Sequence, residues 1–153
     1  MIRRAETSDA GWIAALWTAM ITDTLFTFTT EPKTPDDVAK MIATRPFLVL
    51  PDKGGFATYS PFRSGPGYAA TMEHSILLDP SAQGRGDGRR LMQALLDHGR
   101  SEGHHAMIGA VSSANPNAIA FHAAMGFDTV AQMPEVGRKG GQWLDLILMQ
   151  KLL

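Results

Sequence analysis

A glycine-rich turn at residues 83–88, Gln-Gly-Arg-Gly-Asp-Gly, constrains this chain more than any other feature. It follows an apolar run at residues 75–78 and precedes a segment, residues 89–100, whose apolar positions recur at helical spacing. Glycine lets the backbone approach an anion closely, and the N–H groups at a helix start carry the positive end of the dipole. Arg85 and the two arginines after the turn add positive charge there. The order strand, turn, helix therefore predicts a phosphate-binding site.

Size and composition fit a single domain spanning residues 1–153. Hydrophobic residues make up 44% and charged residues 19%, which suits a globular chain rather than a disordered one. The formal net charge is −1, so we expect no nucleic-acid and no membrane partner. The lack of cysteine excludes disulfides, thiolate–metal sites and a cysteine nucleophile. No segment reads as a signal sequence or a membrane span, so we expect a cytoplasmic protein.

Hydrophobic periodicity and turn residues predict a mixed α/β sheet. Capping side chains at residues 7–9 start a first helix, and Thr34-Pro35 starts a second helix that ends before Pro46. A short strand and an ordered loop are equally consistent with residues 22–30. Strands are expected at residues 1–5, 47–50, 55–60, 68–78, 106–111, 127–133 and 143–151, helices at 89–100 and 115–125, and a polar connection between the last two strands.

Two motifs, at the right distance from each other, resemble those of the GNAT acetyltransferase superfamily. The first, which resembles the acyl-CoA pyrophosphate loop, is Gln83-x-x-Gly86-x-Gly88. The second, which resembles the helix-to-strand segment beside the cofactor, is Asn115-x-x-Ala118-x-x-Phe121-His122-x-x-x-Gly126-Phe127. Many members carry tyrosine at the position of His122. Over almost the whole chain, the resemblance implies a mostly antiparallel sheet of about seven strands, splayed at its centre and flanked by about four helices.

Further segments resemble a narrower group, the phosphinothricin and methionine-sulfone N-acetyltransferases. They lie at residues 55–59, 62–63, 68, 72–75 and 136–145. Those enzymes acetylate the α-amino group of small amino-acid analogues. The resemblance implies acetyl-CoA as co-substrate, direct transfer to the amine, no metal, a protective role against toxic analogues and, as is common among similar enzymes, a homodimer.

Amine acetylation needs a deprotonated nitrogen, so a base within reach of the substrate assists it. Glu73 is the first candidate, because it lies mid-strand just before the segment expected to line the cofactor. Strand alternation places Glu73 and Ser75 on one face and His74 on the other. A solvated or salt-bridged carboxylate is an equally good reading from the residues alone, and the resemblance favours catalysis.

His122 is the second candidate for a catalytic residue. A protonated His122 could donate to the departing sulfur, and a neutral one could relay the proton of the substrate. A lone helical histidine is more often structural, but its coincidence with the motif position favours a catalytic role.

The resemblance implies that the turn and the preceding strand hold acetyl-CoA. Backbone groups of Ser75, Ile76 and Leu77 would pair with the pantetheine arm like an added strand, with an N–H near Leu77 facing the oxyanion. Asn115 is expected to bond near that arm, to cap its helix, or both. The expected cofactor-binding residues are Ser75, Ile76, Leu77, Gln83, Gly84, Arg85, Gly86, Asp87, Gly88, Arg89 and Asn115.

Asp87 is unusual in such a turn, because a carboxylate repels phosphate. We expect this carboxylate to turn towards solvent, with Arg85 or Arg89 as its partner, and cofactor affinity to survive.

Arg63 is the expected clamp for a substrate carboxylate, because its planar fork matches one bidentately. An isolated loop arginine is usually a solvated charge, and the resemblance favours the clamp. The expected substrate-binding residues are Phe28, Phe62, Arg63, Tyr68, Glu73, His74 and Trp143.

Two other functions remain open: a non-catalytic acyl-CoA-binding domain, and an acetyltransferase for protein N-termini or lysines. A nucleotide P-loop is excluded, because no Gly-Lys-Ser/Thr follows the glycines. A dinucleotide fold is disfavoured, because its glycine turn follows the first strand.

Overall fold

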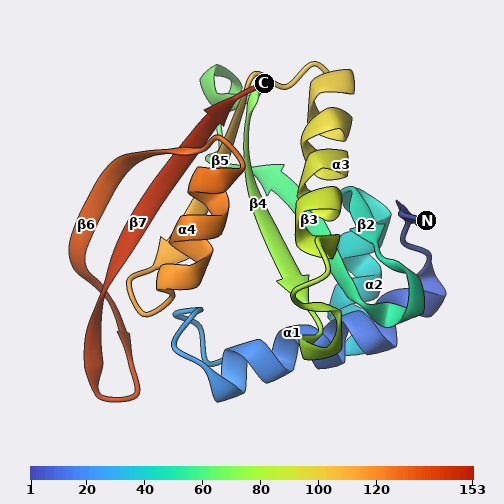
Figure 1. Ribbon diagram of the computed structural model, residues 1–153, viewed down its shortest axis with the longest axis horizontal. Helices are drawn as coiled ribbons and strands as arrows, with labels where there is room; N and C mark the ends of the chain where they lie inside the picture. Colours follow the sequence, from blue (N-terminus) through green and yellow to red (C-terminus); the bar gives the residue numbers. More distant parts are fainter.

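Seven strands form one sheet with helices on both faces (Figure 1). The computed structural model describes all 153 residues. The strands are β1 (Arg3–Arg4), β2 (Phe47–Val49), β3 (Gly55–Pro61), β4 (Thr71–Leu78), β5 (Ala106–Ser112), β6 (Asp128–Lys139) and β7 (Gln142–Leu152). The helices are α1 (Ala10–Asp23), α2 (Pro35–Thr44), α3 (Asp87–Ser101) and α4 (Pro116–Ala124). The spatial order of the strands is β1-β2-β3-β4-β5-β7-β6, and β4–β5 is the parallel pair. The expected order and class are confirmed.

Alternation along the strands builds a separate core on each face of the sheet. On one face, α1 and α2 cover side chains such as Phe47, Phe56 and Leu77. On the other face, the apolar stripe of α3 packs on side chains such as Met72 and Met107. Burying each such side chain contributes about 1.5–3 kcal/mol. The sheet therefore separates the space near α1 from the space near α3 and α4.

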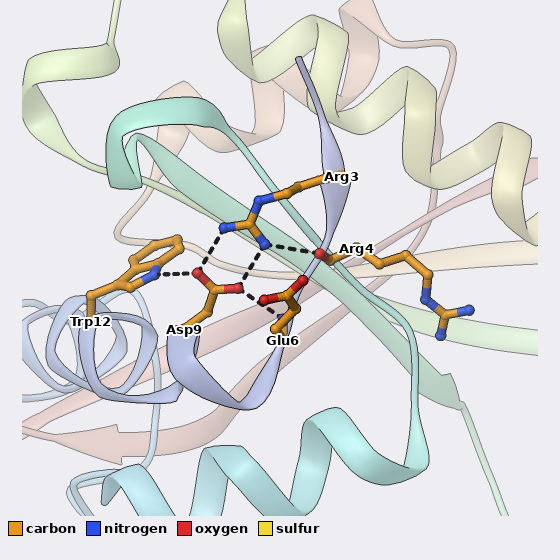
Figure 2. A network of polar contacts seen from close by, with 5 residues as sticks. All are labelled: Arg3, Arg4, Glu6, Asp9 and Trp12. Carbon is orange, nitrogen blue, oxygen red and sulfur yellow. Dashed lines mark hydrogen bonds and ion pairs between the residues drawn. The ribbon is translucent and has the colours of Figure 1, made fainter.

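The start of α1 is held by the carboxylate of Asp9, which is 8% exposed. Arg3 donates to both oxygens of this carboxylate at 2.8 and 3.0 Å, and the Glu6 backbone N–H and Trp12 Nε1 donate to it as well (Figure 2). These hydrogen bonds, first of all those from Arg3, lower the pKa of Asp9 well below its usual range. The network ties β1 to α1.

The helix start expected at Thr34 is confirmed. The Thr34 side chain accepts from the Asp37 backbone N–H at 3.1 Å, and the Asp37 carboxylate accepts from the Thr34 N–H at 2.9 Å. The reciprocal pair satisfies two N–H groups at the helix start that have no partner within the helix.

Two elements differ from the expectation, and one ambiguity is resolved. Residues 68–70 are not strand: Pro66–Tyr68 form a 3₁₀ turn, and β4 begins at Thr71. β6 continues to Lys139 instead of ending near Met133, because pairing with β7 resumes at Gly137 after an irregularity between Met133 and Gly137. Residues 24–34 form a loop, which resolves the ambiguity at 22–30. None of the helices combines the length and apolarity that crossing a bilayer requires.

The parallel pairing of β4 with β5 is short. It runs from Thr71↔Ala106 to His74↔Gly109 and then stops, although both strands continue. Beyond His74, β4 remains paired with β3 and β5 with β7. The sheet is thus splayed at its centre, as the resemblance implied, and the backbone of residues 75–78 faces the gap.

Candidate active site

A cavity of about 130 Å³ lies where β4 and β5 separate. Trp17 and Met20 enter it from the face of the sheet covered by α1, and Ala118 and His122 enter it from α4 on the opposite face. The cavity therefore connects the two faces through the gap in the sheet. Its lining residues are Trp17, Met20, Phe26, Thr27, His74, Ser75, Ile76, Leu77, Gly109, Ala110, Val111, Ser112, Asn115, Ala118 and His122.

Two buried histidines form one wall of this cavity. His74 Nε2 and His122 Nε2 are 2.9 Å apart, and the rings stack with centroids 5.1 Å apart. The rings of Phe121 and Phe127 surround them. Burial, together with the neighbouring His122, lowers the pKa of His74 to about 3. Burial also lowers the pKa of His122, against the opposing effect of the Ala118 carbonyl. Both rings are therefore neutral at physiological pH.

Gly109 makes room for the histidine pair. A Cβ at this position would lie 3.0 Å from His122 Cδ2 and 3.0 Å from His74 Cε1. The absence of a side chain at Gly109 therefore lets α4 bring His122 against the sheet. Gly109 is also the last residue of β5 that pairs with β4.

Glu73 projects to the face opposite His74, as alternation predicts. It is half-buried, pairs across the sheet with Ser60 and Ile108, and does not line the cavity itself. Ser75, two residues further along the same face, does line it. Burial raises the pKa of the Glu73 carboxyl, which brings its titration closer to neutrality. Such a carboxylate can accept a proton directly or through a water.

The turn at residues 83–88 lies between β4 and α3, as expected. Gly84 and Gly86 have φ values of 79° and 78°, in the left-handed region that favours glycine. A Cβ at either position would meet nothing within 4 Å, so the turn is open on its outer side. Gly86 is the N-cap of α3 and supplies no side-chain acceptor, which leaves N–H groups of the first turn available. Such a cradle of free N–H groups can receive a phosphate or diphosphate group.

Asp87 is oriented differently from the expectation. Its side chain is 13% exposed rather than turned to solvent, and it forms ion pairs with Arg85, at 3.7 Å, and with Arg90. The expected pairing with Arg85 is confirmed, and the second partner is Arg90 rather than Arg89, because residues three apart share one side of a helix. The same three side chains line a second cavity, of about 280 Å³, beside the turn.

Asn115 is the N-cap of α4. Its Oδ1 accepts from the Ala118 backbone N–H at 3.2 Å, and the residue also lines the cavity. The structural role is thus established, and contact with the pantetheine arm remains a prediction.

The expected substrate-binding residues are dispersed. His74 lines the cavity, whereas Phe28 packs on Gly137 of β6. The guanidinium of Arg63 lies 5.7 Å from the centroid of the exposed Tyr68 ring. Phe62 lies in the same β3–β4 loop, and Trp143 is exposed near the tip of the β6–β7 hairpin under Arg138. None of these five side chains, Phe28, Phe62, Arg63, Tyr68 and Trp143, enters the cavity.

Sequence reasoning named Phe28 but missed its neighbours Phe26 and Thr27, which close the cavity near α1. Phe26 and Thr27 belong to the loop after α1, which is held by two side chains from distant strands. Lys139 Nζ donates to the carbonyls of Ile21 and Thr27 at 2.7 Å each, and Ser112 Oγ donates to the Leu25 carbonyl at 2.8 Å. The run of threonines and aromatics at residues 22–30 was the available signal, since such a composition is unusual for an exposed connection.

Known proteins show the same architecture. The chain is 35% identical to the L-amino acid N-acyltransferase MnaT of Escherichia coli, over 97% of this chain and 91% of that protein. It is 36% identical to the L-methionine sulfoximine/L-methionine sulfone acetyltransferase of Pseudomonas aeruginosa, over 97% and 92%. The solved phosphinothricin acetyltransferase of Sinorhizobium meliloti, in complex with acetyl-CoA, superposes with a TM-score of 0.93 at 31% identity, covering 100% of this chain and 88% of that one.

The sequence pattern of the acetyltransferase (GNAT) family matches residues 15–127, which include the splayed strands, the glycine turn and α4. The open turn and the cavity through the sheet agree with this match. The chain therefore belongs to the acetyltransferase (GNAT) family.

Proposed function

We propose that this enzyme transfers an acetyl group from acetyl-CoA directly to the amino group of a small amino-acid-like substrate. The observation that carries the proposal is the gap after His74↔Gly109, which lets two ligands meet from opposite faces of the sheet. Relatives of this chain are named for methionine sulfoximine, methionine sulfone and phosphinothricin. Phosphinothricin, methionine sulfone and methionine sulfoximine are therefore the first substrates to test.

In this proposal, acetyl-CoA lies on the side of the gap near α3 and α4. The N–H groups of residues 83–88 hold its diphosphate, with Arg85 and Arg89 adding charge, and the free β4 backbone at Ser75, Ile76 and Leu77 holds its pantetheine arm. When bound, acetyl-CoA supplies the thioester carbonyl. A backbone N–H near Leu77 is placed to donate to the oxygen that becomes negative during transfer.

The amine approaches from the side covered by α1, where Glu73 projects. The nitrogen bonds to the acetyl carbon, the carbon–sulfur bond breaks, and one proton leaves the nitrogen. Glu73 serves as the base for that proton, because its raised pKa gives it a stronger affinity for a proton than an exposed carboxylate has. The proposed substrate contacts remain Arg63, Phe62, Tyr68, Phe28 and Trp143. These side chains would have to close around the amine in order to contact it.

The test is a panel of amino acids and analogues supplied with acetyl-CoA, with release of free thiol as the readout. We expect turnover on at least one member of the panel. Glu73→Gln should lower kcat by about 100-fold or more while CoA affinity in calorimetry stays unchanged. Glu102→Gln, at an exposed carboxylate distant in sequence from the cavity, is the matched control.

The same experiment separates the alternatives. A non-catalytic binding domain would bind CoA but release no thiol with any amine. A protein acetyltransferase would turn over peptides with free N-termini or lysines and not amino acids. The volume of about 130 Å³ favours a small amine.

We also propose that the enzyme is cytoplasmic, works without a metal, protects against toxic amino-acid analogues and forms a homodimer. Exposed apolar side chains on the edge strand β6, at Val130, Met133 and Val136, support the dimer. Light scattering that gives the mass of one chain at micromolar concentration would contradict it.

A further inference from the structure

The hydrogen bonds around the histidine pair assign its protons. His122 Nδ1 is 2.6 Å from the backbone carbonyl of Ala118. A carbonyl oxygen only accepts, so this nitrogen carries a proton. In a neutral His122 ring, Nε2 is then a bare acceptor. The contact of 2.9 Å with His74 Nε2 needs one proton between the two nitrogens, and that proton belongs to His74.

The alternative assignment has His122 doubly protonated, with the shared proton on its own Nε2. It would place a positive ring at a position that is 5% exposed. It would also require His74 to carry its proton on Nδ1, a buried nitrogen that has no hydrogen-bond partner.

The groups that face the two rings do not favour a charge. They are Phe121 from α4, Phe127 before β6, Gly109 and the Ile108 backbone from β5, and the Ala118 carbonyl. The Ile108 backbone raises the pKa of His74, but burial outweighs it, and no carboxylate is among these groups. Glu73, the adjacent acid on β4, projects to the other face of the sheet. Burying an uncompensated charge costs several kcal/mol, so the neutral assignment holds.

We propose that His74 is a positioning residue that keeps His122 neutral with its proton on Nδ1, so that His122 does not supply the proton taken by the departing sulfur. The inference rests on the proposed acetyl transfer and deepens it. The Nε2 lone pair of His122 is occupied by His74, and its only proton is engaged with Ala118 within the same helix. Neither nitrogen of His122 is free to give a proton to a ligand or to receive one.

The proton balance of the reaction then runs through the other face of the sheet. The proton lost by the attacking nitrogen passes to Glu73, directly or through a water. The sulfur that leaves the acetyl carbon is protonated from Glu73 or from water. The acid side of the pH profile consequently reports Glu73: as pH falls through its raised pKa, the base form is lost and turnover falls. Neither His74 nor His122 contributes an ionisation near neutrality.

The direct test is nuclear magnetic resonance of the unmodified protein labelled with ¹⁵N-histidine, without any ligand. Long-range ¹H–¹⁵N spectra at pH 7 should show His122 protonated on Nδ1 alone and His74 protonated on Nε2 alone. Neither ring should gain a second proton near neutrality, because burial lowers the pKa of both. A doubly protonated His122, or one protonated on Nε2 alone, would overturn the proposal. The measurement needs no turnover, so it is independent of the substrate.

Variants at position 74 link the assignment to catalysis. His74→Phe keeps a ring but removes the donor, so Nε2 of His122 becomes free to take a proton and His122 should titrate at a higher pH than in the parent protein. The pH profile should gain a second ionisation, and kcat should fall about tenfold. His74→Gln should restore most of kcat and the original profile, because its amide can donate to the same nitrogen. His105→Phe, at an exposed position, is the control.

A His74→Phe protein that retains kcat and the single-ionisation profile would overturn the positioning role. If this variant fails to fold, the tautomer spectra of the unmodified protein still test the proton assignment. Failure of the proposed function has a different appearance: the spectra show the assigned tautomers, yet no amino acid in the panel is acetylated.

Discussion

His74 and Gly109 form the last residue pair that joins β4 to β5, and the two strands diverge immediately beyond them. The imidazole of His74 lies over Gly109 and meets His122 from α4 at the same point. One position of the sheet thus combines the opening through which two ligands can meet and the buried ring pair beside it.

Gly109→Ala tests how tightly this position is packed. The added Cβ would lie 3.0 Å from both imidazoles, and overpacking of this kind costs about 1–3 kcal/mol of unfolding free energy. Urea denaturation should show that loss, and kcat should fall because the rings separate. Gly11→Ala is the control, since a Cβ there meets nothing within 4 Å, and it should be neutral or stabilising by up to about 1 kcal/mol. Equal stability of the two variants would mean that the histidine pair can shift without cost.

Lys139→Met should loosen the loop that closes the cavity near α1. The buried Nζ has three acceptors, the Ile21 carbonyl, the Thr27 carbonyl and Thr27 Oγ1, and its charge lies at the C-terminal end of α1. Removing it leaves buried carbonyls unpaired, which costs about 1–3 kcal/mol. The KM for the amine should rise severalfold while CoA affinity stays constant. Lys40→Met, on the exposed side of α2, should change neither quantity.

Asp9→Asn should make stability depend less on pH. The pKa of Asp9 is lowered in the folded state, chiefly by Arg3, so its contribution is present above its ordinary value of 3.8 and is lost as pH falls through the folded-state pKa. The variant should be about 1–3 kcal/mol less stable than the parent at pH 7, and this difference should shrink below about pH 4. Urea unfolding at several pH values measures it. Asp97→Asn, which breaks an exposed pair with Arg100, should cost less than about 1 kcal/mol at any pH.

Asp87→Asn should tighten CoA binding. The carboxylate places a negative charge in the turn and pairs with Arg85 and Arg90, so removing it leaves both guanidinium groups free for phosphate. We expect a gain of about three- to tenfold at low salt, smaller at high salt, measured by calorimetry. Asp97→Asn, near the far end of α3, should leave the affinity unchanged. A weaker affinity for Asp87→Asn would show instead that the ion pairs order the turn.

Local patterns predicted much of this site. The glycine turn at residues 83–88, the cap at Asn115 and the opposite orientations of Glu73 and His74 follow from positive φ, helix-end chemistry and strand alternation, which act over a few residues. The length of β6 was not predictable in the same way. Its strand pairing resumes because β7 supplies partners, which local propensity does not report.

The amino-acid sequence by itself determined the order of strands and helices, the two faces of β4 and the turn that can receive a phosphate, because each depends on neighbouring residues. Only the tertiary structure decided that His74 meets His122, 48 positions away, and that Lys139 reaches back to Ile21 and Thr27. Those contacts depend on where the sheet splays and how α1 and α4 pack on it. The Ala118 carbonyl of the same helix accepts from Nδ1 of His122, whereas the partner of Nε2 comes from a segment 48 positions away, which only the fold brings there.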